Sequence, residues 1–525
     1  MVHEGPTTRL FASWRSKSYD VLPALSIRGK ELRSSLHAVT MGWVFGSMWM
    51  IGIGGATISN FAKLTDWGDF HWGVYQAIGF LAMLAQLPAS YIVEATGLRK
   101  ITFLGVTTIH RLMWMFVGLG PLMMMLFPGQ IGPGAVISAT FMLIFLSSVL
   151  GNMGSPAWVT WMSDLIPTRI RGRYFARRNA ICLVVQMFAT LSLGWLLDHV
   201  IVGGKAISIA NQPALVWTLV GIFAVAGLAG AMDITMFRRI REVVRPRPPQ
   251  RPSMRQILTE PLRNRKFLRY VSACATMTFG MAVSGMFFLT LCQNTFRLNS
   301  MTTNLILVVF GLFGGLASSG FFGRLTDRWG RRPVMIVCMI GTVFGAWLWL
   351  LVPDNRPSFL DGPFWTFLRE WAPIMVPNEP PAVLTVAVSA MVVFFGGVVG
   401  TGLGIAQFNM LLGFSNESGR SAYTAASSII SSLAGVIGGL LGGYLAESTK
   451  GFVWHVGPFL FVNYHIVFLV SGAIRGLSII GLIGMSDPGA KPTRMMLRAM
   501  ANNLTPMILW PARIVTSRLP RLRCL

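Results

Sequence analysis

One acid and four arginines lie within ten residues that separate two long apolar segments, 301–322 and 333–352. The acid is Asp327, and the basic and glycine residues around it are Gly323, Arg324, Arg328, Gly330, Arg331 and Arg332. A carboxylate at a helix end can accept hydrogen bonds from free backbone N–H groups at the start of another helix. The arginines can pair with this acid or with lipid phosphate, and glycine permits a sharp turn. This chemistry suits a contact between helices and not a catalytic step.

Two further arginines fall inside apolar segments. Arg111 lies ten residues past the start of its segment, which at about 1.5 Å per residue places it roughly 15 Å deep, near the centre of a bilayer. Arg475 is similarly deep in the last segment. A buried arginine is costly unless it is paired, so Arg111 is predicted either to form a structural pair or to bind an anionic or carbonyl-bearing substrate. Its neighbour His110 is expected to point elsewhere on the helix.

Motifs for catalysis and for metal or phosphate binding are missing from the sequence. It contains no Walker loop, zinc motif or nucleophile elbow, and residues 435–443 resemble a phosphate loop only in their glycine content. The five cysteines show no CxxC spacing and are interpreted as small core residues. The sequence therefore predicts a protein that is not an enzyme and has no cofactor or metal site.

The composition is that of a membrane protein, with 53% hydrophobic and only 12% charged residues in a chain of 525. The net charge of +25 would suggest nucleic-acid binding in a soluble protein. Here the arginines cluster in the breaks between apolar runs, which favours a role in membrane orientation. We expect an integral protein of the cytoplasmic (inner) membrane that binds no nucleic acid and has no signal peptide.

Apolar runs of about 20 residues, long enough to cross the hydrocarbon core, occur twelve times. They cover residues 37–59, 71–93, 101–126, 134–161, 175–198, 214–237, 268–293, 302–322, 333–352, 382–413, 421–446 and 459–485. Twelve spans place both termini on one side, and the loops on that side contain 36 of the 44 lysines and arginines. By the positive-inside rule both termini are predicted to be cytoplasmic, with the basic loops near anionic lipid headgroups.

A basic, proline-rich stretch divides the spans into two sets of six. The predicted domains are a cytoplasmic tail (1–36), an N-terminal six-helix bundle (37–237), a basic linker (238–266), a C-terminal bundle (267–485) and a basic tail (486–525). The linker segment 253–267 fits either an interfacial amphipathic helix or solvated chain. The aromatic loop 353–381 is expected to lie at the headgroup level or to cover the substrate path.

The two halves share two loop patterns, which indicates an internal repeat. An offset of 233 residues aligns Gly97 with Gly330, Glu94 with Asp327 and Arg99 with Arg332. A second offset, of 249 residues, aligns Arg171 with Arg420 between the fourth and fifth spans of each half. The matches fall between helices of the same number in each half, so the sequence predicts a duplicated six-helix unit.

With these loops after the second and eighth spans, nearly the whole chain resembles the major facilitator superfamily of secondary transporters. The resemblance implies an all-α integral membrane fold of two pseudo-symmetric six-helix bundles. It also implies a substrate site between the halves and alternating access by rocking of one half against the other. In one access state, Asp327 would contact the start of the fifth span near Arg171 and Arg173, and Glu94 would contact the start of the eleventh span near Arg420.

The resemblance further implies that the first, fourth, seventh and tenth helices line the cavity. The candidate cavity residues on these and neighbouring helices are Trp43, Trp49, Gln76, Arg111, Asn152, Gln186, Gln293, Gln407 and Asn409. Amides suit a neutral polar or zwitterionic solute and tryptophans suit an apolar or aromatic face, although each amide can instead join two helices. All acids, Asp233 included, lie at helix ends, which leaves uniport, proton coupling through histidine, or another ion such as sodium.

The predicted function is secondary active or facilitated transport of a small organic solute by a monomer. The alternative is a transporter-like membrane protein that acts as a receptor, in lipid or pigment handling, or as an assembly factor. The eroded first-half loop, the absence of acids near the midplane of the spans and the many tryptophans are the features that favour this alternative. In the eleventh span, small residues at a spacing of four predict close helix packing. They are Ser427, Ser431, Gly435, Gly439 and Gly443.

Overall fold

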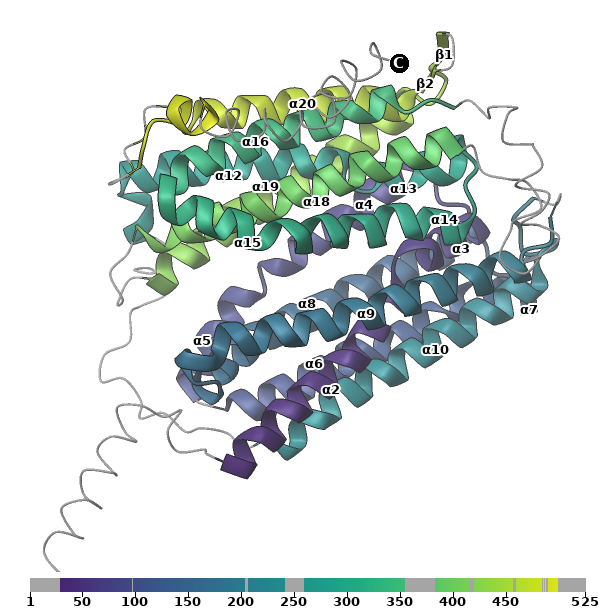
Figure 1. The fold of residues 1–525 in the computed structure, drawn as a ribbon. Coiled ribbons are helices and arrows are strands. Elements are labelled where there is room, and N and C mark those ends of the chain that lie inside the picture. Colours follow the sequence, from purple (N-terminus) through teal and green to yellow (C-terminus); the bar gives the residue numbers. More distant parts are fainter. Residues whose placement is uncertain are drawn as a thin grey trace, which may run out of the picture.

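The computed structural model describes residues 29–498, apart from 97, 204–205, 241–258, 355–382, 415–419, 457–458, 484, 486 and 488–489. Within the described part of the chain, twelve helical segments are long and apolar enough to cross a membrane. Figure 1 shows them as a lower bundle from the first half and an upper bundle from the second half. The predicted helical membrane fold of two six-helix bundles is confirmed.

The first half has three spans that each consist of two consecutive helices, followed by three continuous spans. Its helices are α2 (Gly29–Ile53), α3 (Gly55–Leu64), α4 (Asp69–Met83), α5 (Gln86–Thr96), α6 (Arg99–Val117), α7 (Leu119–Leu126), α8 (Pro133–Leu165), α9 (Thr168–Val200), α10 (Pro213–Met236) and the 3-10 turn η2 (Phe237–Arg239). The first span is broken at Gly55, whose φ of +54° is in the region that favours glycine. This break lets α3 start as a separate helix with free N–H groups.

The second half begins with spans that contain π-helical turns. Its helices are α12 (Arg265–Ser284), α13 (Phe287–Thr290), η3 (Leu291–Thr295), α14 (Ser300–Asn304), η4 (Leu305–Phe310), α15 (Gly311–Trp329), α16 (Arg331–Trp347), η5 (Leu348–Leu351), α18 (Val383–Leu412), α19 (Arg420–Ser448) and α20 (Asn463–Ile480). Strands β1 (Val453–Val456) and β2 (Phe459–Val462) form an antiparallel hairpin before α20. The last span therefore begins later than predicted, because residues 459–462 are extended. Of the segment 253–267 the structure describes residues 259–267, whereas 353–381 lies outside the described residues apart from 353–354.

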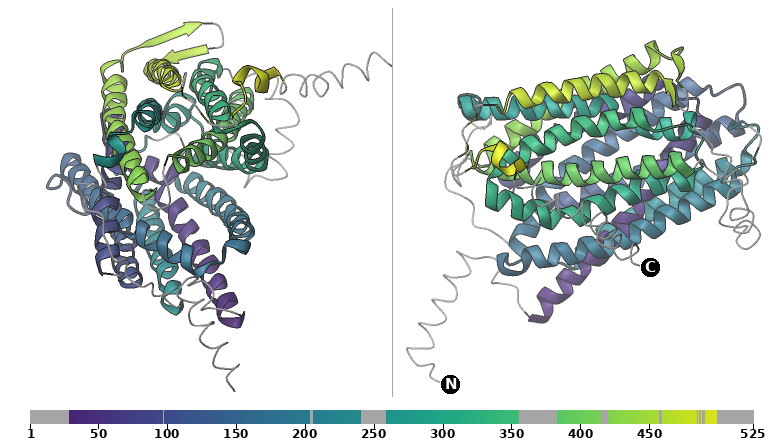
Figure 2. Two further views of the ribbon diagram at one scale, coloured as in Figure 1. Left: turned by 90° about the vertical axis from the view of Figure 1, so that its left-hand side faces the viewer. Right: turned by 45° about the horizontal axis from the view of Figure 1, so that its top comes forward.

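The two bundles meet at one end and separate toward the other (Figures 1 and 2). We call the first the closed end; the chain turns there between α3 and α4, after α9, and between α19 and α20. We call the other the linker end; α5, α15 and α18 finish there. The pattern of hydrophobic burial agrees with this shape. One apolar cluster contains Phe61 and Phe223 of the first half together with Phe287 and Phe468 of the second.

Two further apolar clusters each belong to one half alone. Trp161 and Phe237 lie in a cluster built only from the first half. Phe267 and Met335 lie in a cluster built only from the second half. Close side-chain packing is a main cause of helix association in a bilayer, so the halves are held together where they share a core and are independent where they do not.

Glycines let α4 and α19 cross closely at the boundary between the halves. A Cβ atom on Gly73 of α4 would lie 2.6 Å from the carbonyl oxygen of Gly439 and from the Cα atom of Gly443. Gly435 packs in the same way against the ring of Phe80. The small-residue stripe predicted in the eleventh span is therefore confirmed as a packing surface, and its partner is the second span.

Candidate functional site

Two carboxylates join the halves at the closed end. Asp198, near the end of α9, accepts hydrogen bonds from the backbone N–H groups of Ser300 (2.8 Å) and Met301 (2.9 Å) at the start of α14. Glu447, near the end of α19, accepts from the N–H groups of Asp69 (3.0 Å) and Phe70 (3.4 Å) at the start of α4. Helix N-termini carry free N–H donors and a positive dipole end, so each carboxylate suits its position. We call these two contacts the outer clasps.

Side-chain hydrogen bonds reinforce the outer clasps. The N–H group of Ala56, at the start of α3, donates to Oδ1 of Asn304 at 3.0 Å. Ser59 donates to Oε1 of Gln293, and the Nδ2 atom of Asn60 lies 3.1 Å from the Ser300 hydroxyl. The polar face of α3 therefore binds the second half directly.

Asp69 makes a further contact across the boundary through its side chain. Its carboxylate accepts hydrogen bonds from Nδ2 of Asn463 and from the hydroxyl group of Tyr464, each at 2.9 Å. All three residues are at least nine-tenths buried. Every hydrogen bond between the two halves that joins described residues lies at this end.

The loop that ends α15 has a different arrangement at the linker end. Gly330 has φ +96°, as the predicted sharp turn requires. Asp327 is exposed, and its carboxylate forms no ion pair with any described residue. The start of α16 is capped by Asp487 instead, whose Oδ2 atom accepts from the N–H groups of Arg331 and Arg332 at 3.0 Å each. Sequence reasoning missed Asp487 because it follows the last span, far from α16 along the chain.

The remaining candidates for the linker-end contacts are only partly placed. Arg328 has its guanidinium 6.0 Å from the ring centroid of Trp329, and Gly323 has open space at its Cβ position. Arg99 is buried at the start of α6. The residues whose side chains or whole positions lie outside the described part are Glu94, Gly97, Arg171, Arg173 and Arg420. The predicted contact of Asp327 with the fifth span stays a prediction.

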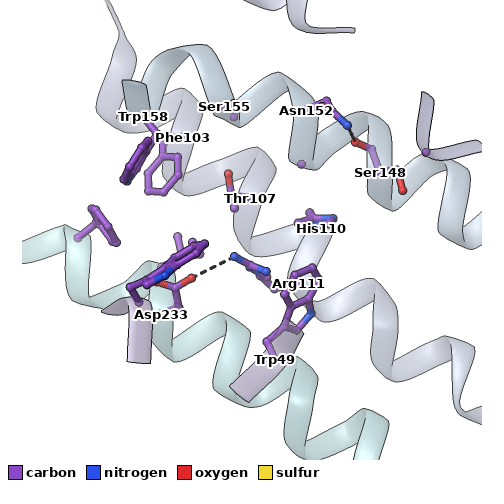
Figure 3. Close-up of a pocket in the computed structure, with 16 residues that line it drawn as sticks. Trp49, Phe103, Thr107, His110, Arg111, Ser148, Asn152, Ser155, Trp158 and Asp233 are labelled. Atoms are coloured by element: carbon purple, nitrogen blue, oxygen red, sulfur yellow. Dashed lines mark hydrogen bonds and ion pairs between the residues drawn. The ribbon is translucent and has the colours of Figure 1, made fainter. Parts of the chain in front are cut away.

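A cavity of about 440 Å³ lies within the first half, between α2, α6, α8 and α10. Four predicted cavity residues line it: Trp43, Trp49, Arg111 and Asn152. Figure 3 shows Arg111 reaching from α6 toward Asp233 of α10, with Trp49 beside it. The Nη2 atom of Arg111 lies 3.1 Å from Oδ2 of Asp233, and its Cζ atom is 3.6 Å from the Trp49 ring centroid. The structural pair predicted for Arg111 is thus present, together with a cation–π contact.

Three glycines make room for this ion pair. A Cβ atom on Gly46 of α2 would lie 2.5 Å from Oδ2 of Asp233, and one on Gly42 would lie 3.0 Å from Oδ1. On α10, a Cβ atom on Gly230 would lie 2.8 Å from both the Arg111 and the Trp49 side chains. The close approach of α2, α6 and α10 therefore depends on residues without side chains.

Asp233 and His110 each make a contact that the sequence did not predict. Asp233 does lie near the end of α10, but it is 2% exposed and faces the bundle interior, so a buried acid is present among the spans. His110 points toward α8, whereas Arg111 points toward α10. His110 lines the same cavity, and its Nδ1 atom lies 2.7 Å from the hydroxyl group of Ser147. Neither the position of Asp233 near the helix end nor the spacing of the polar residues in the sequence predicted these two contacts.

The other candidate cavity residues lie elsewhere. Gln76 lines a smaller cavity of about 290 Å³ that also includes Met286 of the second half. Gln186 is buried and lies 3.3 Å from the Ser47 hydroxyl. Gln293 belongs to the closed end, as described above, and the backbone carbonyl of Gln407 accepts a hydrogen bond from Tyr270. Asn409 is half-buried on α18. The structure therefore does not gather these amides into a single site.

Arg475 on α20 is 6% exposed and bonds within the second half. It donates to the backbone carbonyl of Thr342 (2.9 Å) and to the hydroxyl group of Ser284 (2.7 Å). None of the cavities described above includes it. Its contacts are those of a residue that joins α12, α16 and α20.

Comparisons with known proteins agree with this architecture. A sequence profile of the Major Facilitator Superfamily matches residues 44–377, whereas no curated protein matches the chain. The solved structure of nucleoside transporter NupG is similar with a TM-score of 0.56 and 11% identity, over 87% of this chain and 99% of that one. The xylose transporter XylE from E. coli, in a partially occluded inward-open conformation, gives 0.56 and 11%, over 88% and 100%.

A third similar structure is a bacterial homologue of the iron transporter ferroportin in an inward-facing state. Its TM-score is 0.53 at 13% identity, over 87% of this chain and 99% of that one. At such low identities these structures establish the fold and not the solute. The matched profile and the twelve membrane-spanning segments lead to the same conclusion: this chain belongs to the major facilitator superfamily of membrane transporters.

Proposed function

We propose that the protein carries a small organic solute across the cytoplasmic membrane, by secondary active or facilitated transport with rocker-switch alternating access. Both termini are cytoplasmic in this proposal, because the loops on their side hold most of the lysines and arginines. The closed end then faces outward, and the described conformation is inward-facing. A fold built from two similar halves around a central site is the arrangement that rocking requires.

The observation that carries the proposal is the restriction of the contacts between halves to one end. The outer clasps and the shared apolar cluster join the halves at the closed end. The clusters of the linker end belong to separate halves. A static channel or a receptor needs no such asymmetry, whereas a transporter caught in one of two access states does.

The outer clasps suggest how the two states exchange. Asp198 and Glu447 lie at the ends of the fifth and eleventh spans and cap the eighth and second spans. The family resemblance places the inner contacts between the same helices at their opposite ends, through Asp327 and Glu94. Rocking would therefore break one pair of carboxylate contacts while the other pair forms, so that neither state is favoured by a large margin.

The proposal is tested by solute flux into liposomes that contain the purified full-length protein. The solute panel includes nucleosides, xylose and iron ions, which are the solutes named for the structurally similar transporters, together with amino acids and aromatic acids. We expect saturable uptake of at least one organic solute. Comparison with and without a proton or sodium gradient separates coupled transport from uniport.

Empty liposomes and liposomes with an Asp198→Asn/Glu447→Gln variant are the controls. The variant keeps the size of both side chains but removes the charges of the outer clasps. Wild-type flux equal to that of empty liposomes across the whole panel would contradict transport and favour the non-transporting alternative.

A further inference from the structure

The cavity inside the first half is separate from the boundary between the halves, where the proposed transport site is expected. We propose that this cavity binds a ring-bearing organic solute whose carbonyl or carboxylate oxygen accepts hydrogen bonds from Arg111 and Thr107. The inference rests on the proposed transport function only in taking the bound molecule as the cargo. Its volume of about 440 Å³ lies in the usual range for small-molecule sites.

The walls of the cavity are predominantly aromatic. The rings come from α2, α6, α8 and η2, and they belong to Trp43, Trp49, Phe103, Trp158 and Phe237. In Figure 3, Phe103 and Trp158 lie close together on one side of the cavity, and Trp49 lies beside Arg111. Aromatic faces bind flat apolar bodies through both area and ring geometry.

Three polar atoms on residues that line the cavity have no hydrogen-bond partner in the described part of the chain. The Nε atom of Arg111, the hydroxyl oxygen of Thr107 and the Nε1 atom of Trp49 are buried and have no hydrogen-bond partner among the described residues. Arg111 is only 7% exposed and Thr107 only 6%. Buried donors without partners are costly, so a ligand oxygen at this position would be stabilised.

The charge balance limits the class of ligand. Asp233 pairs with Arg111, so the cavity has no unpaired carboxylate that would attract a cation. The ion pair still presents the other guanidinium N–H groups of Arg111 as donors. These features fit a neutral carbonyl compound or a monocarboxylate, and they do not fit a cationic amine or a metal ion.

Small residues on α8 let this helix lie close to the polar residues of α6 at the floor of the cavity. A Cβ atom on Gly154 would collide with the hydroxyl oxygen of Thr107, and one on Gly151 would lie 2.9 Å from the His110 ring. Ser148 and Ser155 line the same face of the helix. Figure 3 shows this face of α8 opposite Thr107 and His110. A larger side chain at position 155 would occupy the space that the ligand needs.

This cavity adjoins a smaller cavity at the boundary between the halves. Gly79 of α4 and Ser148 of α8 line both this cavity and the smaller one that contains Gln76 and Met286. A Cβ atom on Gly79 would meet nothing within 4 Å. A solute bound near Arg111 can therefore exchange with the boundary past Gly79, which is the passage that transport would use.

Equilibrium dialysis of radiolabelled probes against the full chain in nanodiscs tests the site independently of flux. The probes are 2-naphthoate and 2-naphthamide, which combine a ring with an acceptor, 2-methylnaphthalene, which lacks the acceptor, and octanoate, which lacks the ring. We expect saturable binding of a naphthyl probe with an acceptor and affinities at least about tenfold lower for the other two. Binding to empty nanodiscs is subtracted as partition into lipid.

Matched variants locate the binding. Ser155→Phe fills the cavity and should abolish saturable binding, whereas Ser138→Phe on the exposed face of the same helix should not. Thr107→Val removes the free hydroxyl group and should weaken binding about fivefold. Gly79→Leu should slow both association and release, whereas Gly105→Leu, with equally open space but on an exposed face of α6, should alter neither.

The outcomes separate this proposal from the transport proposal. If no probe binds above the empty nanodisc level, or if Ser155→Phe binds as tightly as the wild type, the site assignment is wrong even where the liposome assay detects flux of another solute. If the probes bind at the cavity but no solute crosses the membrane, the binding-site proposal is supported and the transport proposal is contradicted.

Discussion

Asp198 and Glu447 occupy equivalent positions in the two halves, and each caps a helix of the opposite half. They are 249 residues apart, which is the offset that aligns the fifth and eleventh spans in the sequence. Their partners, the starts of α14 and α4, belong to the eighth and second spans. The closed end is thus held by two contacts that the internal repeat relates to each other.

The buried pair of Arg111 and Asp233 should be essential to the stability of the first half. Asp233→Asn leaves the guanidinium buried without a counter-charge, and we expect the free energy of unfolding to fall by about 3–5 kcal/mol. An Arg111→Met/Asp233→Leu double variant should recover most of this loss because no charge remains buried. Thermal unfolding in nanodiscs measures both, with Asp66→Asn, an exposed acid, as the control. A single variant as stable as the wild type would show that the pair is dispensable.

The crossing of α4 and α19 should not tolerate a methyl group at Gly73. The added Cβ atom would overlap the backbone of α19, so Gly73→Ala should cost about 1–3 kcal/mol in contacts between the halves. Gly79→Ala on the same helix has open space and is the matched control. We expect Gly73→Ala alone to increase the reactivity of a cysteine placed at Ser59 toward a membrane-impermeant thiol reagent. Equal reactivity in the two variants would contradict the tight crossing.

Asp327 should matter for the cycle and not for the stability of this conformation. It is exposed and has no ion-pair partner among the described residues, so Asp327→Asn should change the free energy of unfolding by less than about 0.5 kcal/mol. Solute turnover should nevertheless fall, because the variant would weaken the inner contact that we propose for the other access state. Turnover and melting temperature are measured on the same preparation. A solute turnover equal to that of the wild type in this variant would show that Asp327 has no role in the transport cycle.

The sequence predicts the spans well because twenty apolar residues in succession have few alternatives in a bilayer. It also identifies the loop at Gly330, since the positive φ there requires a residue type that is visible in the sequence. The burial of Arg111 was predicted from its depth within the third apolar segment alone. These features depend only on residues that are close together in the sequence, so they can be predicted without a structure.

The partners of the charged residues are not local. Arg111 and Asp233 are 122 residues apart, and nothing in the sequence of α10 shows that Asp233 turns toward α6. The outer clasps depend on contact between the halves, although the 249-residue offset that matched two loops also relates Asp198 to Glu447 and could have drawn attention to them. The hairpin of β1 and β2 was missed because its apolar residues continue the pattern of the last span.

The account depends most on the claim that the outer clasps hold one of two access states. Spin labels at Val202 and Arg297 report the distance between the halves at the closed end, and labels at Leu98 and Arg324 report it at the linker end. All four positions are exposed. Double electron–electron resonance in liposomes, in a background without the five native cysteines, then measures both distances in each variant.

Asp198→Asn removes charge-assisted hydrogen bonds worth about 1.5–3 kcal/mol, which corresponds to a roughly ten- to hundredfold shift between the states. The account predicts a longer closed-end distance together with a shorter linker-end distance. Glu447→Gln should act in the same direction but less strongly, because the Glu447 side chain is 44% exposed and therefore screened by solvent. Asp66→Asn should change neither distance. Unchanged distances in both clasp variants, or a change of the same sign at both ends, would contradict the central claim.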